Sequence, residues 1–179
     1  MYRGHLGLST KEQSHFHPAN NCEICQMQRY WEELIERALQ EDVGPGDHSS
    51  NCAIPAETIG AMQLWIKEAG VLAGLKVAQA VFAAVDQDIR FEALAEDGRA
   101  VQAGQVVLRV DGRVRSLLQA ERLALNFMQR MSGIASYTRR LTEMIAHTSC
   151  RLLDTRKTTP GLRRMEKEAV RLGGGHNHR

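Results

Sequence analysis

The sequence predicts an α+β domain followed by the beginning of an α/β barrel. Across residues 27–115, helical and strand patterns occur in the order helix, strand, helix, strands, which is typical of α+β folds. Residues 116–146 then have helical spacing, and residues 151–172 form a strand-turn-helix unit, the building block of a βα barrel. A barrel of eight such units takes at least about 200 residues, so we expect the barrel to be incomplete in this chain of 179 residues.

The composition is that of a globular protein. Hydrophobic residues make up 43% and charged residues 25%, which excludes collagen-like, low-complexity and wholly disordered chains. The longest apolar run, residues 80–85, is far shorter than the roughly 20 residues of a membrane-spanning helix. The N-terminus has no apolar stretch long enough for a secretory signal, and four cysteines do not make a disulfide framework. We therefore expect a soluble, cytoplasmic protein.

The net charge of +2 hides an uneven distribution. Residues 151–179 contain eight Lys or Arg and three Asp or Glu, so this segment carries +5 and the rest of the chain −3. Positive charge collected at one end suggests that anions bind there. A solvated basic helix would have the same composition.

Residues 1–26 are a polar leader without a clean period, which we expect to be flexible. His15, His17, Cys22 and Cys25 form the pattern H-x-H-x4-C-x2-C. Two imidazoles and two thiolates can bind zinc tetrahedrally, but the spacing alone is weak evidence. A loose leader with ordinary reduced thiols explains the same residues.

The first regular element is an amphipathic helix over residues 27–41. Its apolar residues recur at the spacing of three and four that lines one helix face. We expect the helix to end before Val-Gly-Pro-Gly-Asp at 43–47, because two glycines and a proline cannot continue it. The apolar face comprises Met27, Tyr30, Trp31, Leu34, Ile35, Ala38 and Leu39.

Strands and a second helix follow. Residues 62–66 alternate as in a half-buried strand, and residues 76–85 are apolar and alanine-rich, which favours a helix. Residues 89–94 alternate again, and residues 105–110 form a β-branched strand. An Asp-Gly pair at 97–98 marks the turn between these last two strands.

The last third of the chain is mainly helical. Residues 116–146 are predicted to be helix, with the Ser-Gly pair at 132–133 as a break or a kink. Residues 151–154 are predicted to form a short buried strand, residues 158–161 a turn, and residues 162–172 an amphipathic helix ended by three glycines.

The loop after the predicted strand 151–154 is the first candidate site. In a βα barrel, functional groups lie at the C-terminal ends of the strands and in the loops that follow. Arg156 and Lys157 are adjacent there; Arg clamps a carboxylate or phosphate with two hydrogen bonds, and Lys adds a compact charge. A basic loop in solvent is the alternative interpretation.

A second candidate group follows the glycines at 173–175. Glycines let the backbone approach a ligand closely, and a His178–Arg179 pair beside them can bind an anion or move a proton. A tail without a partner explains the same residues. No Ser-His-Asp order, Walker loop or Rossmann fingerprint occurs in the sequence.

Longer blocks of sequence carry a resemblance. Three of them are ERLALNFMQRMSGIA at 121–135, LDTRKTTPGLR at 153–163 and EKEAVRLGGGHNHR at 166–179. Two shorter ones are EDVGPGD at 41–47 and GVLAG at 70–74. In this order and spacing, from about residue 30 onward, they resemble the quinolinate phosphoribosyltransferase family, also called nicotinate-nucleotide pyrophosphorylase (carboxylating).

The resemblance implies a type II phosphoribosyltransferase architecture. An N-terminal α/β sandwich would occupy residues 27–115, and residues 116–179 would begin a C-terminal α/β barrel with its first βα unit. The implied reaction transfers a phosphoribosyl group from phosphoribosyl pyrophosphate to quinolinate with decarboxylation. Its products are nicotinate mononucleotide, CO2 and pyrophosphate, in NAD synthesis.

The resemblance also implies a cofactor, partners and site residues. Mg2+ would be bound by the part of the family's barrel that this chain does not contain, and the enzyme would be a homodimer without nucleic-acid or membrane partners. The quinolinate pocket would be lined by Thr155, Arg156, Lys157, His178 and Arg179, with Arg122 donated by the neighbouring subunit. Because quinolinate is a dianion and its sugar donor carries phosphates, a pocket for both has to be basic. Positioning and charge compensation would then favour an oxocarbenium-like transition state.

Since most of the barrel lies outside these 179 residues, we expect the chain alone to be inactive and poorly soluble, as a fragment or a prematurely ended reading frame would be. One alternative is a related nicotinate phosphoribosyltransferase, which does not decarboxylate its substrate. Two blocks of cations favour the quinolinate enzyme, because a second carboxylate asks for additional positive charge. The other alternative is a non-catalytic module that forms dimers.

Overall fold

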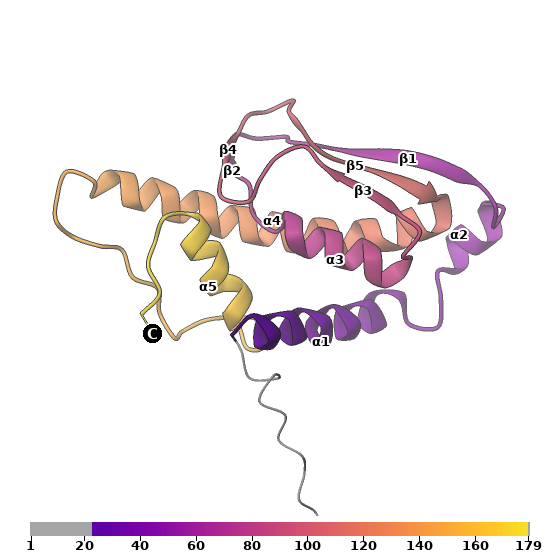
Figure 1. Cartoon of the computed structure of the whole chain (residues 1–179), viewed down its shortest axis with the longest axis horizontal. Helices are drawn as coiled ribbons and strands as arrows, with labels where there is room; N and C mark the ends of the chain where they lie inside the picture. Colours follow the sequence, from indigo (N-terminus) through magenta and orange to yellow (C-terminus); the bar gives the residue numbers. More distant parts are fainter. Residues whose placement is uncertain (1–22, 179) are drawn as a thin grey trace, which may run out of the picture.

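The structure is a computed structural model that describes residues 23–178, and these residues form five helices and five strands (Figure 1). The helices are α1 (Glu23–Val43), α2 (His48–Ala53), α3 (Leu75–Val85), α4 (Val114–Met144) and α5 (Arg163–Leu172). The strands are β1 (Ile59–Trp65), β2 (Gly70–Val71), β3 (Arg90–Ala93), β4 (Ala100–Val101) and β5 (Val106–Arg113). The described residues form a mixed α/β fold without a closed barrel, as predicted.

The main sheet is antiparallel, with β5 between β1 and β3. On β1, Gly60, Met62 and Leu64 are half-buried while the residues between them are exposed, so the predicted alternation is confirmed. The strands predicted at 89–94 and 105–110 correspond to β3 and β5. A second sheet pairs β2 with β4, and these two-residue strands are too short to show a period in the sequence.

The sheet lies on one side of α3 and α4, and α1 and α5 lie on the other side of this helix pair (Figure 1). The core sits between these layers, because the apolar faces of the helices and the inner face of the sheet meet there. Its largest fully buried side chains are Leu72, Val81, Val107, Val110, Leu117, Met131 and Met165.

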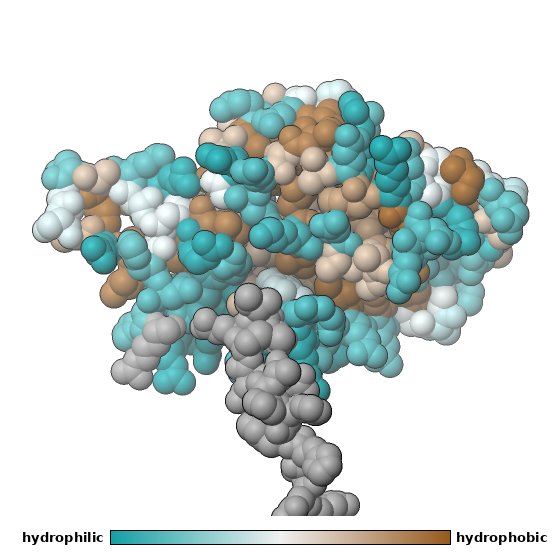
Figure 2. Space-filling model, in the orientation of Figure 1, coloured by the Kyte–Doolittle hydropathy of each residue, from teal (hydrophilic) through white to brown (hydrophobic). Residues whose placement is uncertain are grey.

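The predicted helix at 27–41 is α1, and the one at 76–85 is α3. On α1, Leu34 and Ile35 are buried, as the predicted apolar face requires. An open apolar hollow of about 820 Å³ remains between α1 and α3, bordered by Trp31, Leu39 and Val77. Hydrophobic residues gather over this region in Figure 2.

Helix α2 was not predicted, because it has six residues and little apolar spacing. Asp47 caps its N-terminus: Oδ1 accepts a hydrogen bond from the Ser50 N–H at 3.1 Å, and Oδ2 accepts one from Ser50 Oγ at 2.7 Å.

Helix α4 runs unbroken for 31 residues, so of the two alternatives predicted at 132–133, a break or a kink, the break into two helices is wrong. The hydroxyl of Ser132 bonds a neighbouring segment instead of its own helix: it accepts from the Ala73 N–H at 2.9 Å and donates to the Ala73 carbonyl at 3.1 Å. Ser136, one turn later, accepts from the Val71 N–H at 2.8 Å. Ser132 and Ser136 of α4 therefore hold the 71–73 segment through hydrogen bonds to its backbone.

The buried strand predicted at 151–154 is also wrong. Only an isolated parallel bridge forms there, between Leu153 and His176, and Leu153 is 55% exposed. A strand needs continuous hydrogen-bonded neighbours, and within residues 23–178 the backbone of this segment hydrogen-bonds only the backbone of the loop after α5. The helix predicted at 162–172 is confirmed as α5, with Met165 and Ala169 fully buried.

Candidate functional site

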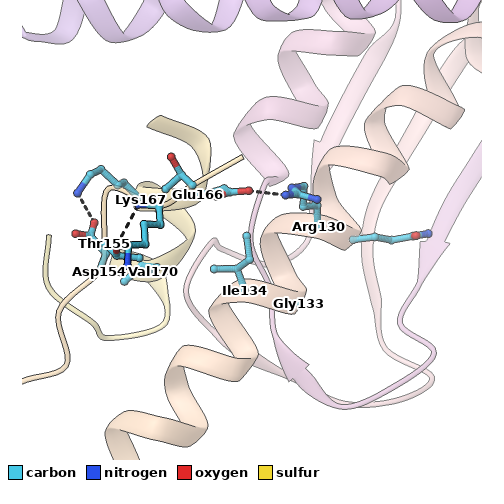
Figure 3. A pocket seen from close by; sticks show the side chains of 11 residues that line it. Arg130, Gly133, Ile134, Asp154, Thr155, Glu166, Lys167 and Val170 are labelled. Carbon is cyan, nitrogen blue, oxygen red and sulfur yellow. Dashed lines mark hydrogen bonds and ion pairs between the residues drawn. The ribbon is translucent and has the colours of Figure 1, made fainter. Parts of the chain in front are cut away.

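An open hollow of about 500 Å³ lies between α4, α5 and the segment that precedes α5 (Figure 3). Charged and polar side chains from three parts of the chain meet in it. Its lining residues are Gln129, Arg130, Gly133 and Ile134 from α4, Asp154, Thr155, Lys157 and Thr158 from the preceding segment, and Glu166, Lys167 and Val170 from α5.

The carboxylate of Asp154 is the best-buried charged group of the hollow, with 4% of its side chain exposed. Oδ2 accepts a hydrogen bond from Lys167 Nζ at 2.5 Å, and Oδ1 accepts one from the backbone N–H of His178 at 2.8 Å. With its amide turned so that all donors are paired, Asn177 adds a hydrogen bond to Oδ2 at 2.8 Å. Asp154 thus joins α5 and the loop after it.

A second ion pair crosses from α4 to α5. Arg130 Nη2 lies 2.5 Å from Glu166 Oε1 and donates to Thr159 Oγ1 at 2.5 Å. The other oxygen of Glu166 accepts from the Thr159 N–H at 3.1 Å. These bonds fix the turn between Lys157 and α5, and Figure 3 shows the one between Arg130 and Glu166.

Both acids of the hollow are held in the ionised form. Burial raises the pKa of Asp154, but the hydrogen bond and charge of Lys167 and the His178 N–H outweigh it, so the pKa lies below its ordinary value. Burial likewise opposes ionisation of Glu166, and hydrogen bonds from Arg130 and Thr159 lower its pKa overall. Each acid therefore compensates one cation of the hollow.

Of the site residues predicted from sequence, Thr155 and Lys157 line the hollow. Arg156 lies between them and is exposed; its carbonyl accepts a hydrogen bond from Arg163 Nη2 at 3.2 Å. His178 is exposed next to Asp154, to which its backbone is bonded. The structure thus brings the predicted residues 155–157 and His178 to one place, on either side of Asp154.

Arg122 lies on α4, about two turns before Arg130, and does not line the hollow. Its side chain is 55% exposed and forms ion pairs with Asp42 at 3.4 Å and with Asp47 at 3.7 Å. Asp42 is in the last turn of α1, and Asp47 is the N-cap residue of α2.

The remaining predicted residues are not part of the structural description. Arg179 lies outside the described residues, as do His15, His17 and Cys22 and the side chain of Cys25. The zinc interpretation of the leader therefore stays a prediction.

Four residues of the hollow were not among the predicted site residues: Arg130, Asp154, Glu166 and Lys167. The sequence contained a signal for two of them. Glu166 and Lys167 follow the basic loop on the first turns of a helix, so their side chains can reach back to that loop. Within residues 23–178, no three His, Cys, Asp or Glu side chains gather as a metal site would require. None of the helices in the described part of the chain is long and apolar enough to cross a membrane.

Known proteins resemble this chain along most of its length. The profile described as "Quinolinate phosphoribosyl transferase, N-terminal domain" matches residues 47–132, and that of the C-terminal domain matches residues 134–179. The chain is 45% identical over 145 residues to a probable nicotinate-nucleotide pyrophosphorylase (carboxylating) of Synechocystis sp.. It is 43% identical over 147 residues to a quinolinate phosphoribosyltransferase (decarboxylating) of Nicotiana tabacum.

The solved structure of NadC from Streptococcus pyogenes is also similar. It matches with a TM-score of 0.80 and 46% identity, over 83% of this chain and 53% of that chain. The match to the Synechocystis protein covers 81% of this chain and 49% of that protein. The chain thus spans about half the length of these relatives, and both domain profiles match it in the expected order. It belongs to the quinolinate phosphoribosyltransferase family.

Proposed function

We propose that this chain provides part of the active site of an enzyme that transfers a phosphoribosyl group from phosphoribosyl pyrophosphate to quinolinate. The products are nicotinate mononucleotide, CO2 and pyrophosphate. The observation that carries the proposal is the meeting of two basic segments, 155–157 and 176–178, at the buried carboxylate of Asp154. Arg156 and Lys157 supply positive charge at this place, and His178 lies beside them.

These residues suit a dicarboxylate. Arg156 can bind one carboxylate through two hydrogen bonds, while Lys157 adds a compact charge. Held in this way, the pyridine nitrogen faces the sugar carbon that carries pyrophosphate. The bond from this carbon to pyrophosphate oxygen breaks as the nitrogen–carbon bond forms, and the chain's part in this step is positioning and charge compensation.

Decarboxylation follows naturally from this first step. Once ribosylated, the ring nitrogen is cationic, so the ring accepts the electron pair that the departing CO2 leaves on its carbon. A proton then replaces CO2 at that carbon. The cations of the loop have to release the carboxylate that leaves as CO2. A moderate affinity for this carboxylate therefore favours turnover more than a high affinity does.

The proposed protein is a homodimer in which Arg122 reaches the quinolinate of the neighbouring subunit. Its exposure and its distance along α4 from the hollow support this role over one in its own subunit. Asp42 and Asp47 keep its guanidinium in one region of the surface.

The family implies Mg2+, which would compensate the charge of pyrophosphate. The described residues do not fit this ion, because no cluster of three acidic or other ligating side chains occurs within 23–178. The step of the reaction that the described residues support is therefore the binding of quinolinate by Arg156 and Lys157.

Calorimetry with the 179-residue chain tests the proposal. We expect quinolinate to bind and Lys157→Met to weaken binding about tenfold, as the loss of one charge contact to a carboxylate does. Lys67→Met is the matched control, since Lys67 is exposed in the connection between β1 and β2 and far from the hollow in sequence. Absence of quinolinate binding, or equal effects of the two variants, would contradict the proposal. Assays with quinolinate, phosphoribosyl pyrophosphate and Mg2+ test the separate prediction that the chain alone does not catalyse the reaction.

A further inference from the structure

Asp154 occupies the point where the two basic segments meet. Its backbone N–H donates to the His176 carbonyl at 2.9 Å, and its carboxylate accepts from the His178 N–H at 2.8 Å. The next residue along the chain, Thr155, begins the other basic segment. Asp154 therefore hydrogen-bonds the loop after α5 and directly precedes the loop that contains Arg156 and Lys157.

The lysine opposite Asp154 strengthens this connection. Lys167 is 16% exposed and bonds Oδ2 at 2.5 Å, so the two charges neutralise each other away from solvent. A buried carboxylate with a charged partner and a backbone partner has little freedom to reorient. The ion pair ties the segment 154–157 to α5, whose burial on α4 through Met165 and Ala169 makes it a rigid base.

We propose that Asp154 is a positioning residue that sets the separation of the two basic segments and thereby the preference for a ligand with two carboxylates. The inference rests on the proposed function. A pyridine with two adjacent carboxylates needs hydrogen-bonding or charged groups from both segments at a fixed separation. A pyridine with one carboxylate needs only one segment, so it tolerates a change in their separation.

The variant Asp154→Asn tests this role, because it keeps the size of the side chain and removes its charge. We expect quinolinate affinity, measured by calorimetry on the 179-residue chain, to fall about tenfold or more, because a displaced segment loses a charge-assisted hydrogen bond to one of the two carboxylates. Nicotinate affinity should change less than about twofold. Equal losses for both ligands would overturn the proposal, because a general loss of structure weakens both.

Amide hydrogen exchange provides a second measurement that needs no ligand. In Asp154→Asn the His178 N–H should exchange at least about tenfold faster, while amides in the middle of α4 keep their protection. If His178 exchange changes no more than that of α4, Asp154 does not hold this loop and the proposal is wrong. Glu168→Gln is the matched control: it removes an acid of α5 that pairs with Arg171 at 2.6 Å, outside the hollow, and should leave His178 exchange and both affinities unchanged.

The two proposals fail in different ways. If the unmodified chain binds neither pyridine, the proposed function is contradicted for this chain, and the exchange of His178 still decides whether Asp154 fixes the loop. If the unmodified chain binds quinolinate and Asp154→Asn binds it equally well, the proposed function stands and the positioning role is overturned.

Discussion

Arg130 on α4 and Glu166 on α5 form an ion pair, with 2.5 Å between Nη2 and Oε1. The pair connects the two helices that line the hollow, and Thr159 bonds both of its members. The side chain of Glu166 is 13% exposed, whereas that of Arg130 is 45% exposed. Because water reaches Glu166 less, the charged form of Glu166 depends on this contact more than that of Arg130 does.

We predict that Arg130→Met lowers the free energy of unfolding by about 1 kcal/mol at neutral pH, as expected for a half-exposed charged hydrogen bond. The folded-state pKa of Glu166 lies below its ordinary value of 4.5. Its contribution is therefore present above that value and is lost as pH falls through the folded-state pKa. Urea unfolding at neutral pH and at a series of pH values below 4.5 should show the two proteins converging as pH falls. Arg140→Met, on an exposed face of the same helix, should change stability little at either pH.

Asp86 should make a second acid-sensitive contribution. Arg113 donates to both of its oxygens, at 2.8 and 2.9 Å, and these hydrogen bonds hold the pKa of Asp86 far below its ordinary value of 3.8. Because the folded-state pKa is depressed, the contact stabilises the fold above pH 3.8 and is lost as pH falls through the folded-state pKa. Asp86→Asn should therefore be less stable than the unmodified chain at neutral pH and approach it on acidification. Asp111→Asn, exposed on β5, is the control, and an equal loss there would contradict this explanation.

Gly173 and Gly133 should respond to alanine with opposite signs. A Cβ at Gly173 would lie 2.4 Å from the Ala135 carbonyl oxygen and 2.6 Å from Thr138 Cβ, so Gly173→Ala forces α5 and α4 apart. We expect a loss of about 1–3 kcal/mol, as for other overpacked sites. A Cβ at Gly133 meets nothing within 4 Å, so Gly133→Ala should stabilise α4 by about 0.5–1 kcal/mol. Thermal unfolding of both variants measures the difference, and the same sign for both would contradict the packing of α5 on α4.

Ser132 is predicted to matter for stability through its contact with Ala73. Ser132→Ala leaves the Ala73 N–H and carbonyl without the hydroxyl that bonds both, at a cost of about 1–2 kcal/mol. Ser49→Ala, at an exposed position of α2, is the control and should have an effect below about 0.5 kcal/mol. Equal midpoints in urea for the two variants would show that the hydroxyl of Ser132 does not hold the 71–73 segment.

The same serine shows where sequence patterns stop being informative. Period and composition located α1, α3, α4, α5 and the main strands, because each buries one apolar face of sufficient length. A Ser-Gly pair at 132–133 looks like a break because its helix propensity is low. Its tertiary partner, the backbone of Ala73, is 59 residues away in the chain, and propensity contains no information about it.

The sequence predicted only part of the candidate site. Charge and the glycines that precede His178 predict Lys157 and His178 as anion-binding residues, and the structure places Lys157 in the hollow and His178 next to Asp154. The pairing of Asp154 with Lys167 could not, because it joins residues 13 apart across a turn whose course depends on Thr159 and Glu166. The apolar sequence of the segment 151–154 predicts a strand, yet a strand is defined by its neighbours as much as by its own residues.

Arg122 provides the sharpest test of the proposed dimer. Because its side chain is 55% exposed, Arg122→Met should change the free energy of unfolding by less than about 0.5 kcal/mol. Quinolinate affinity should nevertheless fall about tenfold at protein concentrations where the dimer forms. At concentrations where sedimentation shows monomer, the variant and the unmodified chain should bind equally, because Arg122 does not line the hollow of its own subunit. An effect of the same size in monomer and dimer would place Arg122 in the site of its own chain and contradict the donated role.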